Sequence, residues 1–342
     1  MNNKERIINL IRKHEVLTKP QIAKLMNFSL PTVNKYVNEL IYEKSLEIDT
    51  TTRRRTEGKP PIYYRLNRAF GKLLGVFFTR NNIIFLVTNV VGNIEKKTFK
   101  RIISTKNLTK EKICDIISKY MRENNLKKDI KFISIGIPGI IGKSGKILET
   151  TLTSKLKDQK LGEYLEEELE IPILVENDLN LVAKSLHNKK EYQNYDNLIY
   201  IHISNENKTV VGGSVIINNK LYTGMSSCVG EFSYLAVDSE LIKSDKKLDF
   251  ETMEEYFLEK LNKTSEEKIE FLSTLILRLI PTLNPEILFI DCKLITYEEI
   301  KLINSRIEKL ISKAHLPLIK KIESKDLGLN GTITHALEFL YS

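Results

Sequence analysis

The pattern of this sequence changes near residue 70, and that change constrains the fold more than any other feature. Before it, three short amphipathic helical patterns and two strand-like pieces follow one another closely. After it, apolar strand-like runs alternate with helical patterns up to the end of the chain, as in an α/β protein. The charge divides at the same place: residues 1–70 hold 14 Lys or Arg and 7 Asp or Glu, a net of +7, whereas the remainder holds 39 and 37, a net of +2. We therefore expect a basic N-terminal module that binds a polyanion, joined to a nearly neutral body.

The basic module has the spacing of a helix-turn-helix. Its first helical pattern places four apolar residues on one side, namely Ile7, Ile8, Leu10 and Ile11. Thr18, followed three residues later by Gln21, predicts the capping box of a second helix. Ser29 and Pro31 predict the start of a third helix, because both residue types favour helix N-termini. The inward stripe expected for this third helix is Val33, Val37 and Leu40.

The outward side of the third helix carries small and amide side chains, which suit a surface that reads a DNA groove. The residues that we expect to contact DNA there are Ser29, Pro31, Thr32, Asn34, Lys35 and Asn38. Strand-like pieces at 46–49 and 62–66 flank a polar connector, as in the wing of a winged helix-turn-helix. The connector supplies four cations that can lie along phosphates or enter a minor groove: Arg53, Arg54, Arg55 and Lys59. We predict a module that binds double-stranded DNA; the alternative is a helical hairpin with a solvated basic loop.

Polar residues end a short apolar run at "ILVENDLN", residues 173–180. Glu176, Asn177 and Asp178 come directly after residues that predict a buried strand. Carboxylates and amides are costly at such a place unless they have partners. The partner is either a ligand or the helix expected at "LNLVAKSL", because an Asp at a helix start is favourable by itself.

The order of motifs along the chain resembles the ROK family, named for repressors, open reading frames and kinases. The motifs are, in order, "GKPP", "RLN", "GIPG", "VENDLN", "GGSVIINNKLYTG", "GEFSY", "LNPEILFID" and "LGLNGTITHALEF". The resemblance implies an actin-like body of the ribonuclease-H-like, sugar-kinase type, with two lobes and a cleft. Residues 71–180 would form the first lobe, completed by about 325–342, and residues 181–324 the second lobe, where we expect dimerisation. Members with an N-terminal winged helix are typically sugar-responsive transcriptional regulators, and members without it are typically sugar kinases.

Three nucleotide contacts of the family's kinases are altered in this sequence. Phe77 stands where the first Gly-rich loop of the kinases has its Asp, and glycines are absent from the turn that follows. The second Gly-rich loop keeps only Gly212 and Gly213, and Asp291 with Cys292 replaces a Gly pair. Without glycines, backbone N–H groups cannot approach phosphates closely. We therefore expect no ATP site and no enzymatic activity.

The zinc site of the family is altered too. Tyr234 stands where family members have a His, and the cysteines that follow in the family are absent. The three cysteines of the chain are scattered and give neither a metal pattern nor a disulfide framework. We therefore expect no metal and no cofactor.

The resemblance also implies residue roles in the cleft. Asn177, Asp178 and Glu231 match family positions that hydrogen-bond sugar hydroxyls, and Asp178 matches the base of the kinases. Carboxylates and amides suit vicinal hydroxyls because they accept or donate in fixed geometry. With Tyr234, these residues are the predicted effector contacts. The alternative is that the cluster is a relic that only caps a helix.

The leading interpretation is a DNA-binding transcriptional regulator, a repressor of sugar-related genes, whose body senses a sugar or sugar-phosphate effector. An effector-independent regulator, whose body only dimerises, and a sugar kinase are the alternatives. We expect a homodimer or higher homo-oligomer, because paired recognition helices suit two-fold operators. The chain has neither a signal-peptide pattern nor a run of about 18 apolar residues, so we expect a cytoplasmic protein with no membrane partner.

Overall fold

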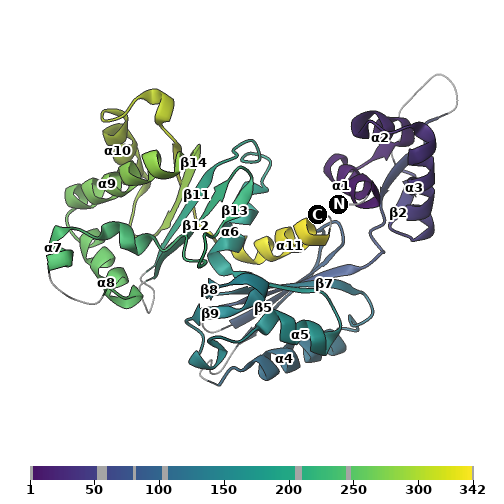
Figure 1. Cartoon of the computed structure of the whole chain (residues 1–342), viewed down its shortest axis with the longest axis horizontal. Coiled ribbons are helices and arrows are strands. Elements are labelled where there is room, and N and C mark those ends of the chain that lie inside the picture. Colours follow the sequence, from purple (N-terminus) through teal and green to yellow (C-terminus); the bar gives the residue numbers. More distant parts are fainter. Residues whose placement is uncertain are drawn as a thin grey trace.

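The computed structural model describes residues 3–51, 60–79, 82–101, 107–204, 210–243 and 248–340. Three parts follow one another along the chain: a small N-terminal unit, a first α/β lobe and a second α/β lobe (Figure 1). The last helix of the chain returns to lie against the first lobe, and its end lies beside the N-terminal unit (Figure 1). None of the described helices is both long and apolar enough to cross a membrane.

The N-terminal unit is a winged helix. Its elements are α1 (Asn3–His14), β1 (Leu17–Thr18), α2 (Lys19–Met26), α3 (Leu30–Tyr42), β2 (Leu46–Asp49) and β3 (Tyr63–Leu66). The strands pair antiparallel in the order β1-β3-β2, so the helical hairpin is wrong. Both predicted caps are confirmed: Thr18 and Gln21 form the capping box of α2, and the side chain of Ser29 accepts from the backbone N–H of Thr32. The predicted inward stripe of α3 is also confirmed, because Val33, Val37 and Leu40 are buried.

The first lobe is a five-stranded sheet between helices. Its strands lie in the order β10-β7-β4-β5-β6. They are β4 (Lys72–Phe78), β5 (Asn82–Asn89), β6 (Ile94–Arg101), β7 (Ile130–Ile137) and β10 (Ile173–Asn177). Strands β10, β7 and β4 are parallel, and β5 and β6 are antiparallel. One face packs on α4 (Lys110–Glu123) and α5 (Leu161–Leu169), and the other packs on α11 (Leu327–Leu340).

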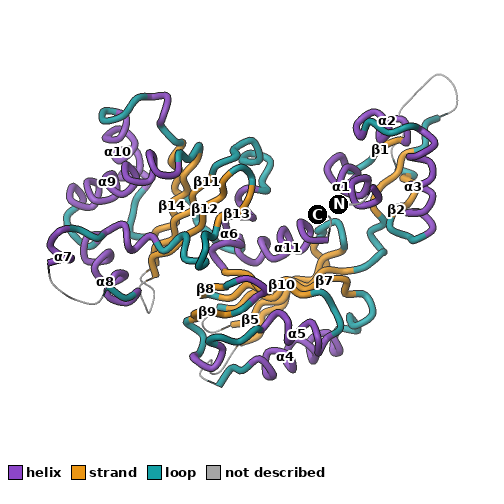
Figure 2. Tube along the Cα trace, viewed as in Figure 1, coloured by secondary structure: helices purple, strands orange, loops and turns teal. Residues whose placement is uncertain are grey.

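The second lobe repeats this plan. Its sheet has the order β13-β12-β11-β14-β15, with β11, β14 and β15 parallel. The strands are β11 (Leu198–Ser204), β12 (Val210–Ile217), β13 (Lys220–Tyr222), β14 (Ile287–Cys292) and β15 (Leu318–Lys321). The outer face is covered by α8 (Phe250–Leu261), α9 (Ser265–Leu283) and α10 (Tyr297–Glu308). The inner face packs on α6 (Asp178–His187), which also lies along α11 (Figure 2).

Two local features differ from the sequence pattern. The pattern predicts a helix from residue 297 to 315, but α10 ends at Glu308. Ser312 has extended backbone geometry and caps a separate short turn at Lys313–His315, just before Pro317. Strand β6 was not predicted, because almost all of its side chains are exposed and leave no buried alternation to detect.

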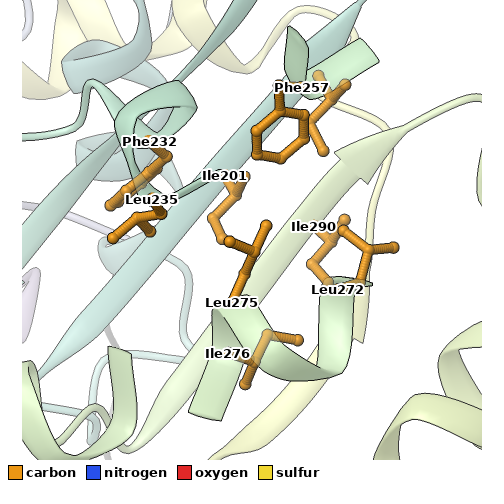
Figure 3. Close-up of a pocket in the computed structure, with 9 residues that line it drawn as sticks. Ile201, Phe232, Leu235, Phe257, Leu272, Leu275, Ile276 and Ile290 are labelled. Atoms are coloured by element: carbon orange, nitrogen blue, oxygen red, sulfur yellow. The ribbon is translucent and has the colours of Figure 1, made fainter. Parts of the chain in front are cut away.

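The core of the second lobe contains a small apolar cavity. It has a volume of about 10 Å³ and lies between the sheet and its outer helices (Figure 3). Its walls include Ile201, Ile290, Phe257 and Leu275, and all lining residues are apolar. A void of this size holds at most about one water and offers that water no hydrogen-bond partner. We therefore regard the cavity as a packing defect.

Candidate functional site

The outward side of α3 presents the predicted DNA contacts, but several of them already have local partners. Ser29 caps the helix, and its hydroxyl lies 2.7 Å from Thr32 Oγ1. Asn38 accepts a hydrogen bond of 2.9 Å from Lys19, a residue at the start of α2 that was not predicted. The remaining polar members, Asn34 and Lys35, make no hydrogen bond within the described ranges, and Pro31 beside them is exposed. Asn34 and Lys35 are therefore the side chains most available to meet a base edge.

The four predicted wing contacts lie outside the described residues; they are Arg53, Arg54, Arg55 and Lys59. The strands that flank them, β2 and β3, are paired along their whole lengths. Arg65 of β3 forms ion pairs with Glu47 and with the buried Asp49 of β2, which holds the two strands together at the base of the connector.

In the cleft between the lobes, Asn177 is the cap of α6. Its Oδ1 accepts from the backbone N–H of Asn180 at 2.9 Å. Its Nδ2 donates to the carbonyl of Gly139 at 2.5 Å. Gly139 has a φ of +141°, which favours glycine, and a Cβ there would lie 2.1 Å from the carbonyl oxygen of Glu149. Capping therefore accounts for the amide of Asn177 without a ligand.

A second polar chain was missed in the sequence. Glu176 accepts from the backbone N–H of Asn177 at 2.8 Å and from the side chain of Asn180 at 2.9 Å. Asn180 accepts in turn from Ser214 of β12 at 2.6 Å. Burial raises the pKa of Glu176, and these hydrogen bonds oppose that rise. Helical spacing gives no signal for this contact, because Glu176 lies at the end of β10, before the cap of α6, whereas Asn180 lies in the first turn of α6.

The two predicted carboxylates of the cleft differ from Glu176. Neither Asp178 nor Glu231 makes a hydrogen bond to another side chain in the described part of the chain. Burial raises the pKa of Asp178 to about 6. Burial, together with the charges of Glu254 and Asp178, raises the pKa of Glu231 to about 7. Backbone N–H groups of Asp178 and Leu179, at the start of α6, hydrogen-bond to the Asp178 carboxylate and oppose the rise of its pKa. Desolvation still dominates at both Asp178 and Glu231, and a bound hydroxyl donor would reduce that cost.

The space beside these residues is small. A polar cavity of about 20 Å³ lies between the lobes, with room for about one water. Its polar lining includes Asn177, Asn180, Ser227 and Glu231, and its backbone lining includes Gly139, Gly212 and Gly213. Asp178 does not line this cavity. The charge of His202 is the largest effect that favours the ionised form of Asp178. A ligand of sugar size would therefore enter only if the lobes moved apart.

Tyr234 stabilises the segment where the family has its zinc site. Its hydroxyl donates to the carbonyl of Leu248 at 3.0 Å. Nearby, Asp238 accepts from Tyr256 at 2.5 Å and from Lys260 at 3.4 Å. These bonds, the first of them foremost, lower the pKa of Asp238 to about 2. These hydrogen bonds join the segment around Tyr234 and Asp238 to the residues at 248–260. Among the described residues, no group of His, Cys, Asp and Glu side chains is arranged to bind a metal.

Phe77 and the surviving glycines act in packing. The ring of Phe77 lies against Gly136 of β7 and Gly328 of α11, where an added Cβ would approach it to 2.6 and 2.5 Å. Gly213 faces the ring of Phe232 in the same way, with 2.6 Å to an added Cβ. A Cβ on Gly212 would lie 2.9 Å from Leu179. The part of the second loop at residues 205–209 lies outside the described residues.

Asp291 belongs to a polar network at the ends of β11 and β14. The two strands are parallel, and His202 is the register partner of Asp291. Asp291 lies 3.0 Å from His202 Nδ1 and accepts from Tyr200 at 3.1 Å. Burial opposes the charge of Asp291, but hydrogen bonds from His202, Ser324 and Tyr200 more than offset it, so its pKa is lowered. His202 was not singled out in the sequence, because its partner is 89 residues away.

Comparison with known proteins agrees with this architecture. A model described as winged helix-turn-helix DNA-binding matches residues 2–41, and the ROK family model matches residues 74–251, about half of the chain. The chain belongs to the ROK family. Within the family it is similar to the xylose repressor of Bacillus subtilis (strain 168), with 27% identity over 239 residues that cover 69% of this chain and 60% of that protein. The xylose repressor of Staphylococcus xylosus is 23% identical over 86% of this chain and 82% of its own length.

Solved structures show the same fold. A ROK family transcriptional regulator, a homolog of the E. coli MLC protein, matches with a TM-score of 0.74 and 17% identity over 98% of this chain and 96% of that chain. The ROK hexokinase of Thermus thermophilus matches with a TM-score of 0.58 and 16% identity over 79% of this chain and 99% of its own. The winged helix with an actin-like, sugar-kinase-type body is thereby confirmed. The chain spans about 60% of the length of the Bacillus repressors that it matches.

Proposed function

We propose that this ROK-family chain is a DNA-binding repressor of sugar-related genes whose cleft binds a sugar effector. The observation that carries the effector is the pair of partly buried carboxylates, Asp178 and Glu231, which have no side-chain hydrogen bond among the described residues and have raised pKa values. Sugar hydroxyls are donors that such carboxylates can accept from. Because the relatives are xylose repressors, xylose is the first sugar to test.

The mechanism follows from the position of the cleft. A ligand that binds the two lobes in one arrangement better than in another shifts the population toward that arrangement. In a homodimer, held through the second lobe at residues 181–324, a change in lobe arrangement alters the spacing of the two winged helices. Operator binding then weakens, which is a coupling between two distinct sites.

Phosphoryl transfer is not part of the proposal. A phosphate cradle needs backbone N–H groups free to approach the nucleotide. Here Phe77 packs against Gly136 and Gly328 where the kinases have an Asp, and Asp291 has His202 as partner where they have a Gly pair.

An effector-independent regulator remains the second candidate. It is favoured by the cap that Asn177 makes and by the small volume of the cavity in the cleft.

A thermal-shift experiment separates the two candidates. Wild type and Asp178→Asn are melted with D-xylose, D-glucose and their phosphate esters, and the exposed Asp115→Asn is the matched control. Each charged hydrogen bond contributes about 1.5–3 kcal/mol, so Asp178→Asn should bind the effector about 10 to 100 times more weakly. Absence of any shift in the wild type would favour the effector-independent regulator, and a shift unchanged in Asp178→Asn would show that the ligand binds elsewhere.

A further inference from the structure

Lys19 and Asn38 form a contact between the two helices of the helix-turn-helix. Lys19 is the first residue of α2, and its Nζ lies 2.9 Å from the side-chain oxygen of Asn38 on α3. A lysine ammonium only donates hydrogen bonds, so the oxygen of the amide must be the atom that faces it. The Nδ2 of Asn38 thereby points away from Lys19, and it makes no hydrogen bond within the described ranges.

The ammonium of Lys19 is also held by an aromatic ring. The ring centroid of Tyr64 lies 5.4 Å from its Nζ. Burial lowers the pKa of Lys19, and no neighbouring carboxylate in the described part of the chain opposes that effect. Glu39 follows Asn38 on α3, but its carboxylate lies 2.8 Å from Lys4 of α1 instead. The positive charge at the start of α2 therefore has no counter-charge among the described residues.

Side chains, rather than the end of the helix, supply the free donors at this place. Thr18 and Gln21 use their backbone N–H groups in the capping box of α2, and Pro20 has none. Lys19 has three N–H donors, and one of them is used on the oxygen of Asn38, the only side-chain acceptor of the pair. The donors that remain are those of Lys19 and of the Asn38 amide. A set of donors with one positive charge matches the oxygens of an anion.

We propose that Lys19 and Asn38 together bind one backbone phosphate of the operator, with the ammonium and the Nδ2 of Asn38 donating to its oxygens. In a helix-turn-helix the first helix crosses the DNA backbone, and the N-terminal residues of the recognition helix contact base edges. Lys19 belongs to the first of these helices, and Asn38 lies in the C-terminal half of α3, after Asn34 and Lys35. The pair thus fixes the position of α3 in the groove, whereas Asn34 and Lys35 meet the bases. This inference rests on the proposed function, since it requires that the winged helix bind DNA.

The affinity of the full chain for random-sequence duplex DNA, measured over a range of salt concentrations, tests the site. Lys19→Met keeps an apolar stem over Tyr64 and removes the charge. The matched control is Lys24→Met, which removes a charge from an exposed position of the same helix. We expect Lys19→Met to weaken binding roughly tenfold and to lower the log–log slope by about one, because one phosphate is no longer neutralised. Lys24→Met should bind as the wild type does.

Two substitutions that differ in charge test Asn38. Asn38→Ala removes neutral donors only, so it should weaken binding about threefold and leave the slope unchanged. Asn38→Asp nearly keeps the shape, but its carboxylate would pair with Lys19 and repel the phosphate. It should therefore weaken binding at least as much as Lys19→Met does and lower the slope by about one. Neither variant should change the base preference found by selection from a random pool of duplexes, because a phosphate carries no sequence information.

The outcomes separate this site from the function on which it rests. If the wild type bound no duplex DNA, the DNA-binding function would be overturned together with the site. If the wild type binds DNA but Lys19→Met keeps its affinity and its slope, only the phosphate site is overturned. A changed base preference in Asn38→Ala would overturn it as well, because Asn38 would then read a base. The melting temperature of each variant without DNA shows whether a lower affinity comes from misfolding, and Asn38→Asp, at an exposed position, still tests the site if Lys19→Met is unstable.

Discussion

Ser214 donates a hydrogen bond of 2.6 Å to the side-chain oxygen of Asn180, and this bond joins the second-lobe sheet to the first turn of α6. Asn180 donates in turn to Glu176 at the end of β10 in the first lobe. Three side chains thus connect the sheets of the two lobes through the helix between them. The link crosses the cleft beside its polar cavity, so it bears on both the stability and the relative position of the lobes.

Ser214→Ala should destabilise the body. Ser214 is fully buried, and its replacement leaves the oxygen of Asn180 without its donor. The expected cost is about 1–3 kcal/mol, or a Tm lower by roughly 2–4 °C for each kcal/mol. The control is Ser305→Ala on the exposed side of α10. Equal melting temperatures for the two variants would show that the bond contributes nothing measurable.

Glu231→Gln should stabilise the protein at high pH. In the folded state the pKa of Glu231 is raised to about 7 from 4.5, so the native state binds more protons than the unfolded state between these values. Stability is therefore lost as pH rises from about 4.5 to 7, and the neutral Gln avoids this decrease. We expect a gain of about 1–3 kcal/mol at about pH 8 and little gain near pH 4.5, measured by urea unfolding. The exposed Glu259→Gln is the control; a gain in Glu231→Gln that did not depend on pH would contradict the burial argument.

Mg-ATP should not bind. The ring of Phe77 packs against Gly136 and Gly328, and Asp291 carries a charge where the kinases have glycine. Titration of the full chain with Mg-ATP should give no heat of binding at millimolar concentration. The ROK hexokinase of Thermus thermophilus, titrated in parallel, is the positive control. A micromolar affinity in this chain would restore the kinase as a candidate.

Replacing the wing arginines should weaken binding to DNA of any sequence. Arg53, Arg54 and Arg55 are expected to lie along phosphates, so their joint replacement by Ala should flatten the salt dependence. The log–log slope should fall by about one for each phosphate that the protein no longer neutralises. The same number of cations is removed from the body in the control Arg122→Ala, Lys127→Ala, Lys128→Ala. An equal decrease in affinity for a random duplex in both variants would place the binding surface outside the wing.

Asn34→Ala and Lys35→Ala should change sequence preference instead. Both side chains lie on the outward side of α3 without a hydrogen bond in the described part of the chain. A base contact is worth about 1–3 kcal/mol of discrimination, so each replacement should relax the preference at one or two base pairs. Selection of bound duplexes from a random pool measures this. Unchanged preference in both variants would show that α3 does not read bases through these residues.

The winged helix could be predicted almost entirely from the sequence. Its caps at Thr18 and Ser29 and its apolar stripe at Val33 and Val37 depend on residues three or four positions apart. Backbone geometry within one helix turn brings such residues together, so their spacing is sufficient evidence. The order of motifs likewise indicated the family and thereby the actin-like body.

The construction of the cleft could not be predicted from local patterns. The His202–Asp291 contact joins positions 89 residues apart, and the Asn180–Ser214 bond joins positions 34 apart on different elements. Strand register and the return of α11 bring these side chains together, and both depend on the burial of whole faces of the two sheets. The sequence could therefore predict that carboxylates lie at the cleft, but not which of them have side-chain partners. In the folded chain Glu176 has such partners, whereas, among the described residues, Asp178 and Glu231 have no side-chain hydrogen bond. A side chain's partners are set by which distant surfaces are buried together, a cooperative property that no short stretch of residues encodes.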